Sequence, residues 1–177
     1  MDLFSRAQGG VLEPLAVRMR PRSLEEFVGQ SHLLGEGRLL AKAIAKDQIM
    51  SAIFYGPPGT GKTTLAHIIS KATKAEFVPV SATTTGVAEL KSIITSAVER
   101  KKYFGQRTIL FIDEIQRLNK GQQDVLLPAL EEGHVVLLAA TTENPYFEVN
   151  AALLSRTRIF DLKPLNNQDL ESIARRA

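Results

Sequence analysis

Two stretches of this chain are apolar or β-branched at every position, and they limit what the chain can fold into. Thr108–Ile112 is one of these stretches, and Val135–Ala140 is the other. A strand with one face in water alternates apolar and polar residues, whereas a strand covered on both faces is apolar throughout. The two stretches therefore predict central strands of a sheet with helices on both faces.

The rest of the chain alternates shorter strands with helices. Three more strands are predicted at Ala52–Tyr55, Phe77–Val80 and Arg158–Leu162. Pro79 places the second of these at an edge of the sheet, because proline cannot donate a ladder hydrogen bond. Apolar residues at helical spacing predict helices at 38–46, 63–72, 87–102 and 122–131, and a further helix begins near residue 168. This alternation predicts an α/β fold, a five-stranded parallel sheet between two helix layers.

Length and composition are those of an ordinary globular domain. The chain has 177 residues, of which 44% are hydrophobic and 23% charged, enough for one domain with a core. It has no cysteine, which excludes disulfides. No apolar run approaches the ~20 residues of a membrane helix, and the N-terminus has no signal-peptide pattern, which fits the cytoplasm. A net charge of +3 permits a nucleic-acid partner without arguing for one.

A glycine-rich segment follows the first predicted strand. Gly56-Pro57-Pro58-Gly59-Thr60-Gly61-Lys62-Thr63 matches the P-loop pattern G-x-x-x-x-G-K-[ST]. Its glycines let backbone N–H groups turn toward phosphates, and the next helix directs its positive dipole end at the anion. Lys62 would meet the β- and γ-phosphates, and Thr63 would offer a hydroxyl to Mg²⁺. Because a strand precedes the motif and a helix follows it, we predict an ATP and Mg²⁺ site, with Thr64 completing the nucleotide-binding segment.

Asp113 and Glu114 close the third predicted strand. The carboxyl end of a central strand lies beside the P-loop in this architecture. Asp113 is predicted to hold Mg²⁺ through its water shell, and Glu114 to polarise the attacking water. Acidic pairs are common in solvated turns, but a pair that ends a buried strand is much rarer. The pair therefore favours ATP hydrolysis.

Polar residues after the fourth predicted strand are candidates for sensing the γ-phosphate. Thr142 is the first candidate, with Thr141 and Asn144 as rivals, although threonine at a strand end also reflects β-propensity alone. Further on, Arg156 could reach a neighbour's γ-phosphate as an arginine finger. For a single chain an ordinary surface arginine is the commoner explanation, and only the resemblance described next favours the finger.

Together these segments resemble the AAA+ ATPases of the clamp-loader clade. The similar segments are, in chain order, 18–21 and 28–30 (an adenine-side motif), 56–63 (Walker A), 109–114 (Walker B), 138–142 (sensor 1) and 155–157 (a Ser-Arg-Cys motif). Thr157 stands in place of the cysteine of the last motif, which leaves Arg156 where the family has its trans-acting arginine. The resemblance implies that the ATP site is shared between subunits.

Within that clade the chain resembles the replication-associated recombination protein A family (RarA), which includes the Werner-helicase-interacting protein. The distinguishing segments are 14–21, 119–124 and 140–148, and the resemblance runs from about Pro14 to the end of the chain. RuvB, the branch-migration motor, shares the run Ile112–Asn119 but resembles a version with a hairpin before sensor 1. Here Glu132-Gly133-His134 alone separates a helix from the fourth strand, which makes RuvB the second candidate.

The RarA resemblance implies a DNA-dependent ATPase that acts in replication-fork maintenance, recombination and DNA repair. It implies DNA with single-strand gaps or forks as the partner, replisome or single-strand-binding proteins as candidate partners, and a homotetramer. It places the protein in the bacterial cytoplasm near the nucleoid, with no membrane. Two alternatives stay open: a RuvB-like Holliday-junction branch-migration motor, and an ATP-dependent recruitment switch with little turnover. The Asp113-Glu114 pair argues against the switch.

The chain is expected to divide into a flexible tail over residues 1–14, an AAA+ core over 15–165, and the start of a truncated helical lid over 166–177. Family members continue through this lid, which carries a sensor 2 arginine, so the chain is expected to bind and hydrolyse nucleotide less well without it. By position, the DNA-contact candidates are Asn119, Lys120, Gln122 and the loop 83–86. Ser81 is a candidate for coupling DNA binding to Glu114.

Overall fold

A computed structural model describes residues 14–176, and the expected tail over residues 1–14 lies outside the described residues except for Pro14, which precedes α1 (Leu15–Arg18). Five strands form one parallel sheet in the order β2-β3-β4-β1-β5. Their bounds are β1 Ala52–Tyr55, β2 Glu76–Ser81, β3 Thr108–Asp113, β4 Val135–Thr141 and β5 Arg158–Asp161. The predicted sheet is confirmed, and β2, the strand with Pro79, lies at an edge as expected.

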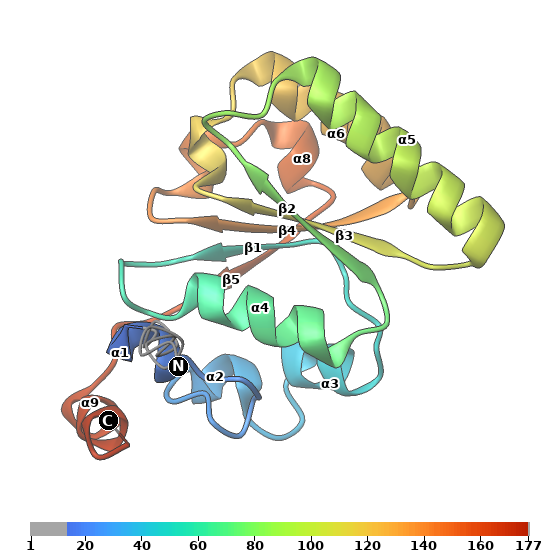
Figure 1. The fold of residues 1–177 in the computed structure, drawn as a ribbon. Coiled ribbons are helices and arrows are strands. Elements are labelled where there is room, and N and C mark those ends of the chain that lie inside the picture. Colours follow the sequence, from blue (N-terminus) through green and yellow to red (C-terminus); the bar gives the residue numbers. More distant parts are fainter. Residues whose placement is uncertain (1–13, 177) are drawn as a thin grey trace, which may run out of the picture.

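Helices cover both faces of the sheet, as the apolar strands predict (Figure 1). On one face lie α3 (Leu39–Ala45) and α4 (Lys62–Ala72). On the other face lie α5 (Val87–Phe104), α6 (Lys120–Glu131) and α8 (Ala151–Leu154). The domain is therefore a three-layer αβα sandwich.

The alternation of side chains along each strand supplies two separate cores. In β3, Ile109 and Phe111 pack with α4, whereas Leu110 and Ile112 pack with α5 and α6. All four are at most 4% exposed. Burial of each such side chain stabilises the fold by about 1.5–3 kcal/mol. Successive residues of a strand point to opposite faces, so a strand with both faces covered is apolar at every position.

The loop before α6 is fixed by the two amide side chains that were DNA-contact candidates. Asn119 Oδ1 accepts from the backbone N–H of Gln122, and Gln122 Oε1 accepts from that of Asn119, which forms a capping box. Gln122 is 8% exposed, and its Nε2 donates to the carbonyl of Thr85 at 2.6 Å. The DNA-contact interpretation of Gln122 is therefore wrong, because its amide is consumed inside the fold. Lys120 remains exposed.

Several short elements were not predicted, because three or four residues are too few to show a helical period. They are α1 (Leu15–Arg18), α2 (Ser31–Leu34), η1 (Ile115–Arg117), α7 (Pro145–Glu148) and α8. The predicted helix near residue 168 is α9 (Asn167–Ala174). No helix within residues 14–176 is long and apolar enough to cross a lipid bilayer.

A buried glutamine ties the N-terminal segment to the segment after β5. Gln30 Nε2 donates to the carbonyl of Lys163 at 2.7 Å, and Gln30 Oε1 accepts from the Lys163 N–H at 2.9 Å. The same Nε2 lies 3.4 Å from the carbonyl of Thr60 in the P-loop. This amide brings two segments that are 133 residues apart to the same side of the P-loop.

Candidate nucleotide-binding site

The P-loop connects β1 to α4, and its last glycine is required by both conformation and space. Gly61 caps the start of α4 with φ of +95°, a region that side chains disfavour. A Cβ at this position would lie 2.7 Å from Cζ of Phe27. The loop therefore turns tightly into the helix while packing against the N-terminal segment.

The charge of Lys62 is held inside the loop. Lys62 is the first residue of α4 and is 7% exposed. Its Nζ donates to the carbonyls of Gly56 at 2.7 Å and Pro57 at 2.9 Å. Burial lowers the pKa of Lys62, while the charges of Glu114 and Asp113 act in the opposite direction. Thr60 braces the same turn through its hydroxyl, which donates to Pro57 at 2.9 Å. When a phosphate binds, the Lys62 ammonium would exchange these neutral carbonyl partners for anionic phosphate oxygens.

The end of β3 meets the start of α4 at the pair expected to hold Mg²⁺. Thr63 Oγ1 donates to Asp113 Oδ2 at 3.1 Å, although the residues are 50 positions apart. Within residues 14–176 no group of three or more carboxylates and imidazoles is arranged to hold a metal ion. One carboxylate and one hydroxyl fit Mg²⁺, which usually keeps several waters and takes its other ligands from nucleotide phosphates.

Glu114 adopts an uncommon backbone conformation next to this pair. Its φ of +55° and ψ of +54° lie in the left-handed region, where few residues other than glycine occur. Its N–H donates to Asp113 Oδ1 at 3.1 Å, and one carboxylate oxygen accepts from Gln116 Nε2. Such strain is typical of functional positions, where surrounding contacts compensate for it.

These side chains share one pocket, which we call the phosphate pocket. It is lined by Pro58, Gly59, Gly61, Lys62, Thr63, Thr64, Asp113, Glu114 and Thr142. The structure thus brings together segments from α4, β3 and the end of β4. Every site residue predicted in the P-loop segment and in the acidic pair at the end of β3 lines this pocket or lies beside it. Gly56, Pro57 and Thr60 lie beside it, because the first two accept from Lys62 and Thr60 stabilises the same turn.

The structure separates Thr142 from its two rivals. Thr141 is buried, and its hydroxyl bonds with the backbone of Glu143. Asn144 caps α7 by accepting from the Tyr146 N–H at 3.0 Å. Thr142 lines the phosphate pocket.

Ser81 pairs with Asp113 in the sheet register, but its hydroxyl contacts the hydroxyl of Thr83 at 3.1 Å rather than Glu114.

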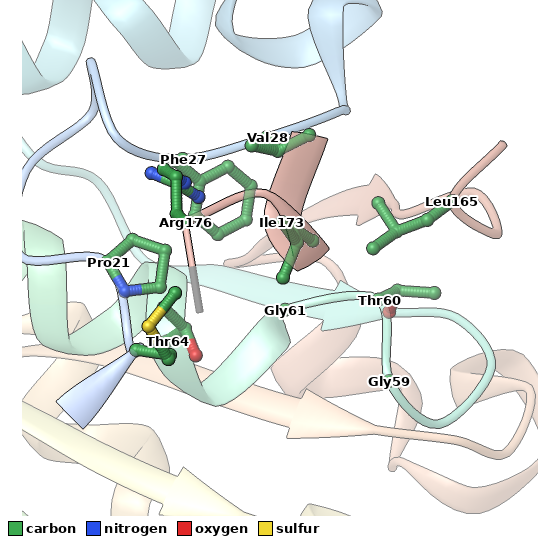
Figure 2. A pocket seen from close by; sticks show the side chains of 11 residues that line it. Pro21, Phe27, Val28, Gly59, Thr60, Gly61, Thr64, Leu165, Ile173 and Arg176 are labelled. Carbon is green, nitrogen blue, oxygen red and sulfur yellow. The ribbon is translucent and has the colours of Figure 1, made fainter. Parts of the chain in front are cut away.

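A second, more apolar pocket of about 160 Å³ adjoins the P-loop (Figure 2). The N-terminal segment supplies Met19, Pro21, Phe27 and Val28, close to the predicted adenine-side motif. The C-terminal segment supplies Leu165, Ile173 and Arg176, which the sequence did not suggest as site residues. Arg176 donates to the carbonyl of Glu26 at 2.9 Å, which holds the two segments together. An apolar cavity beside a phosphate site suits a flat base.

Arg156 lies apart from both pockets. It lines a separate hollow with Met50, Ser51, Ser155 and residues 157–159, none of which lines the phosphate pocket. One guanidinium nitrogen donates to the carbonyl of Ala152 at 2.8 Å, and the other forms an ion pair with Glu131. Within one chain Arg156 therefore does not join the nucleotide site.

The sheet, the P-loop and the acidic pair at the end of β3 define an ATP-binding domain of the AAA+ class. Residues 19–147 match the family model of the Holliday junction DNA helicase RuvB P-loop domain. A solved structure of the Thermotoga maritima RuvB branch-migration motor superimposes with a TM-score of 0.74 at 32% identity. That match covers 89% of this chain and 53% of the RuvB chain. The chain belongs to the family of this RuvB P-loop domain.

The predicted resemblance to replication-associated recombination protein A is also confirmed. The protein of that name from Haemophilus influenzae is 51% identical over 164 residues, and the one from Escherichia coli K12 is 48% identical over 165 residues. Each match covers 93% of this chain. The chain spans little more than a third of these relatives, 36% and 37% of their lengths respectively.

Proposed function

We propose that this chain is the ATPase module of a DNA-dependent AAA+ enzyme that acts in replication-fork maintenance, recombination and DNA repair. The observation that carries the proposal is the phosphate pocket, in which Lys62, the Thr63–Asp113 pair and Glu114 converge. A nucleotide switch with little turnover needs no acid in Glu114's position. The names of the relatives, replication-associated recombination protein A, support a role on replicating DNA.

Each residue of the pocket has a distinct task in this proposal. The segment Gly56–Thr64 binds the nucleotide phosphates, and Lys62 balances their charge. Glu114 polarises the attacking water, and Thr142 contacts the γ-phosphate or that water. Thr63 and Asp113 hold Mg²⁺, which supplies charge stabilisation to the phosphates when it is bound. The adjoining apolar pocket takes the adenine base.

Arg156 completes the site of a neighbouring subunit. Its position outside the chain's own phosphate pocket supports this proposal, since an arginine finger that acts in trans lies away from the site of its own chain. The ion pair with Glu131 would have to open for the guanidinium to reach across an interface. We therefore propose a homo-oligomer, a tetramer by resemblance, in which residues 15–165 form the core and residues 166–177 begin a helical lid.

DNA with single-strand gaps or forks is the proposed partner, and replisome or single-strand-binding proteins are the proposed protein partners. The proposed location is the bacterial cytoplasm near the nucleoid. In the full-length enzyme, gapped DNA should raise the steady-state rate of ATP hydrolysis several-fold over intact duplex of the same length. A rate that does not respond to gapped or forked DNA would contradict a DNA-dependent activity.

A RuvB-like motor is the second candidate, favoured by the P-loop family match and the superposition on RuvB. The segment between α6 and β4 is Glu132–His134 alone, which leaves no room there for the hairpin expected of RuvB. An unwinding assay on four-way junctions separates the candidates. ATP-driven separation of a four-way junction without any response to gapped DNA would favour the motor.

The arginine proposal predicts complementation between two inactive variants of the full-length enzyme. Arg156→Ala should lower turnover by about 10³-fold, because an arginine finger contributes at least that much to phosphoryl transfer. Subunits with Arg156→Ala keep an intact Glu114, and subunits with Glu114→Gln keep Arg156. Mixing the two should therefore restore activity above that of either alone, as measured by phosphate release.

Arg158→Ala is the matched control, since Arg158 is an exposed arginine that lines the same hollow. It should keep near-parent turnover. A mixture no more active than its components would show that Arg156 acts within its own chain or not at all.

A further inference from the structure

The Glu114 carboxylate has a neighbour that neither the motifs nor the comparisons assign. Gln116 lies in η1, and its side-chain Nε2 donates to Glu114 Oε2. We propose that Gln116 is a positioning residue, whose amide holds the Glu114 carboxylate in the orientation needed to activate water. This inference rests on the proposed role of Glu114.

The backbone around this contact is fixed on both sides. Ile115 is fully buried, and the N–H groups of Arg117 and Leu118 donate to Glu114 and Ile115 at 2.9 and 3.0 Å. The Glu114 N–H is bonded to Asp113 Oδ1. The position of the Glu114 carboxylate therefore depends on its own side-chain torsions, which the Gln116 amide restrains.

Within residues 14–176, Glu114 is the one hydrogen-bond partner that orients the amide of Gln116. Its other polar atom, Oε1, is buried and has no hydrogen-bond partner among the described residues. A reversed amide would place Oε1 against the carboxylate, so that two acceptors would face each other. The observed orientation presents the donor to Glu114 and occupies one carboxylate oxygen. The second oxygen is then left to accept a proton from water.

A purely structural role does not account for Gln116. A buried acceptor without a partner lowers the stability of the fold. The same short segment also contains the left-handed backbone of Glu114. Two unfavourable features in one short segment beside the phosphate pocket are typical of a site where function is maintained although stability is lower.

Ser81 was the earlier candidate for control of Glu114, and its hydroxyl is occupied by Thr83 instead. Gln116 differs because it is bonded to the carboxylate directly. Sequence reasoning missed Gln116 because a glutamine two residues after the acid has no distinctive spacing. The left-handed turn at Glu114 is what brings the two side chains together.

The test uses the full-length enzyme with Gln116→Met, which keeps the length of the side chain and removes both amide atoms. Turnover should fall about 10-fold, since small misplacements of a reacting group have effects of this order or larger. Affinity for ATP should stay within about twofold, and the melting temperature should be unchanged or higher because the unpartnered acceptor is gone. Gln116→Glu, which replaces the donor with a second carboxylate, should lower turnover at least as much.

The dependence on Glu114 is tested in the Glu114→Gln background, by single-turnover hydrolysis. Adding Gln116→Met should cause no further loss there, because no carboxylate remains to be positioned. Gln106→Met is the matched control. It removes a half-buried amide that donates to the Lys74 carbonyl at 3.1 Å, outside the phosphate pocket, and it should leave turnover near that of the parent.

The outcomes separate this inference from the proposed function. If Glu114→Gln abolishes turnover and Gln116→Met keeps the parent rate, the positioning role is wrong and the proposed function stands. Loss of ATP affinity or of melting temperature in Gln116→Met, or an equal loss in both backgrounds, would also overturn it in favour of a structural role. If Glu114→Gln hydrolyses ATP at the parent rate, the role of Glu114 fails and this inference fails with it.

Discussion

Lys62→Ala should weaken ATP binding by roughly 30- to 3,000-fold. Truncation of one partner of a buried, hydrogen-bonded charge pair costs about 2–5 kcal/mol, which corresponds to a change of this size in Kd. Lys62 meets the burial condition, since it is 7% exposed and surrounded by the loop that would hold the phosphates. Titration with a fluorescent ATP analogue measures the effect directly.

Lys71→Ala is the matched control, because Lys71 is an exposed lysine on the same helix, outside the phosphate pocket. It should bind ATP as the parent does. Lys62 also bonds the carbonyls of Gly56 and Pro57, so the melting temperature without nucleotide should be compared as well. If Lys62→Ala bound ATP within threefold of the parent, the loop would not be the nucleotide site.

Glu114→Gln should lower turnover by about 10²–10⁴-fold while ATP affinity stays within a few-fold. General bases contribute rate factors of this size, and glutamine keeps the shape of the side chain while losing its basicity. Glu114 lines the phosphate pocket beside the Thr63–Asp113 pair, so the lost group acts on the reaction rather than on binding. Phosphate release under saturating ATP gives turnover, and equilibrium titration gives affinity.

Glu89→Gln, an exposed glutamate in the first turn of α5, is the control and should behave as the parent. This experiment also decides between the enzyme and the recruitment switch. Equal turnover for Glu114→Gln and the parent would favour a switch, in which nucleotide binding alone carries the signal.

The layers of the fold could be predicted because each depends on a local pattern. Residues 109–112 of β3 and 135–140 of β4 are all apolar since both faces of these strands are covered, and Pro79 marks the edge strand. The observed strand and helix bounds differ from the predicted ones by at most two residues. The short helices were missed because a single turn of four residues is stabilised by caps and packing rather than by a repeating pattern.

The site was predictable where its residues are contiguous, and less so where distant segments meet. Sequence alone put Thr142 first but left Thr141 as a close rival, and the structure separates the two because Thr141 is buried with its hydroxyl turned to Glu143. The apolar pocket contains Ile173 and Arg176 because α9 lies against the N-terminal segment, which is a contact between the two ends of the described chain. No spacing within α9 signals that contact.

The sequence by itself determined the αβα sandwich, the P-loop and the acidic pair. Backbone conformation and burial pattern are properties of short stretches, so these features follow from neighbouring residues. The tertiary structure alone decided that Thr63 bonds Asp113, that Gln116 donates to Glu114, and that Arg156 lies outside its own pocket. Each of these depends on how a turn or a packed element directs a side chain in space. The direction of each side chain is set by contacts with residues far away in the sequence, or by a left-handed turn that no sequence motif predicts.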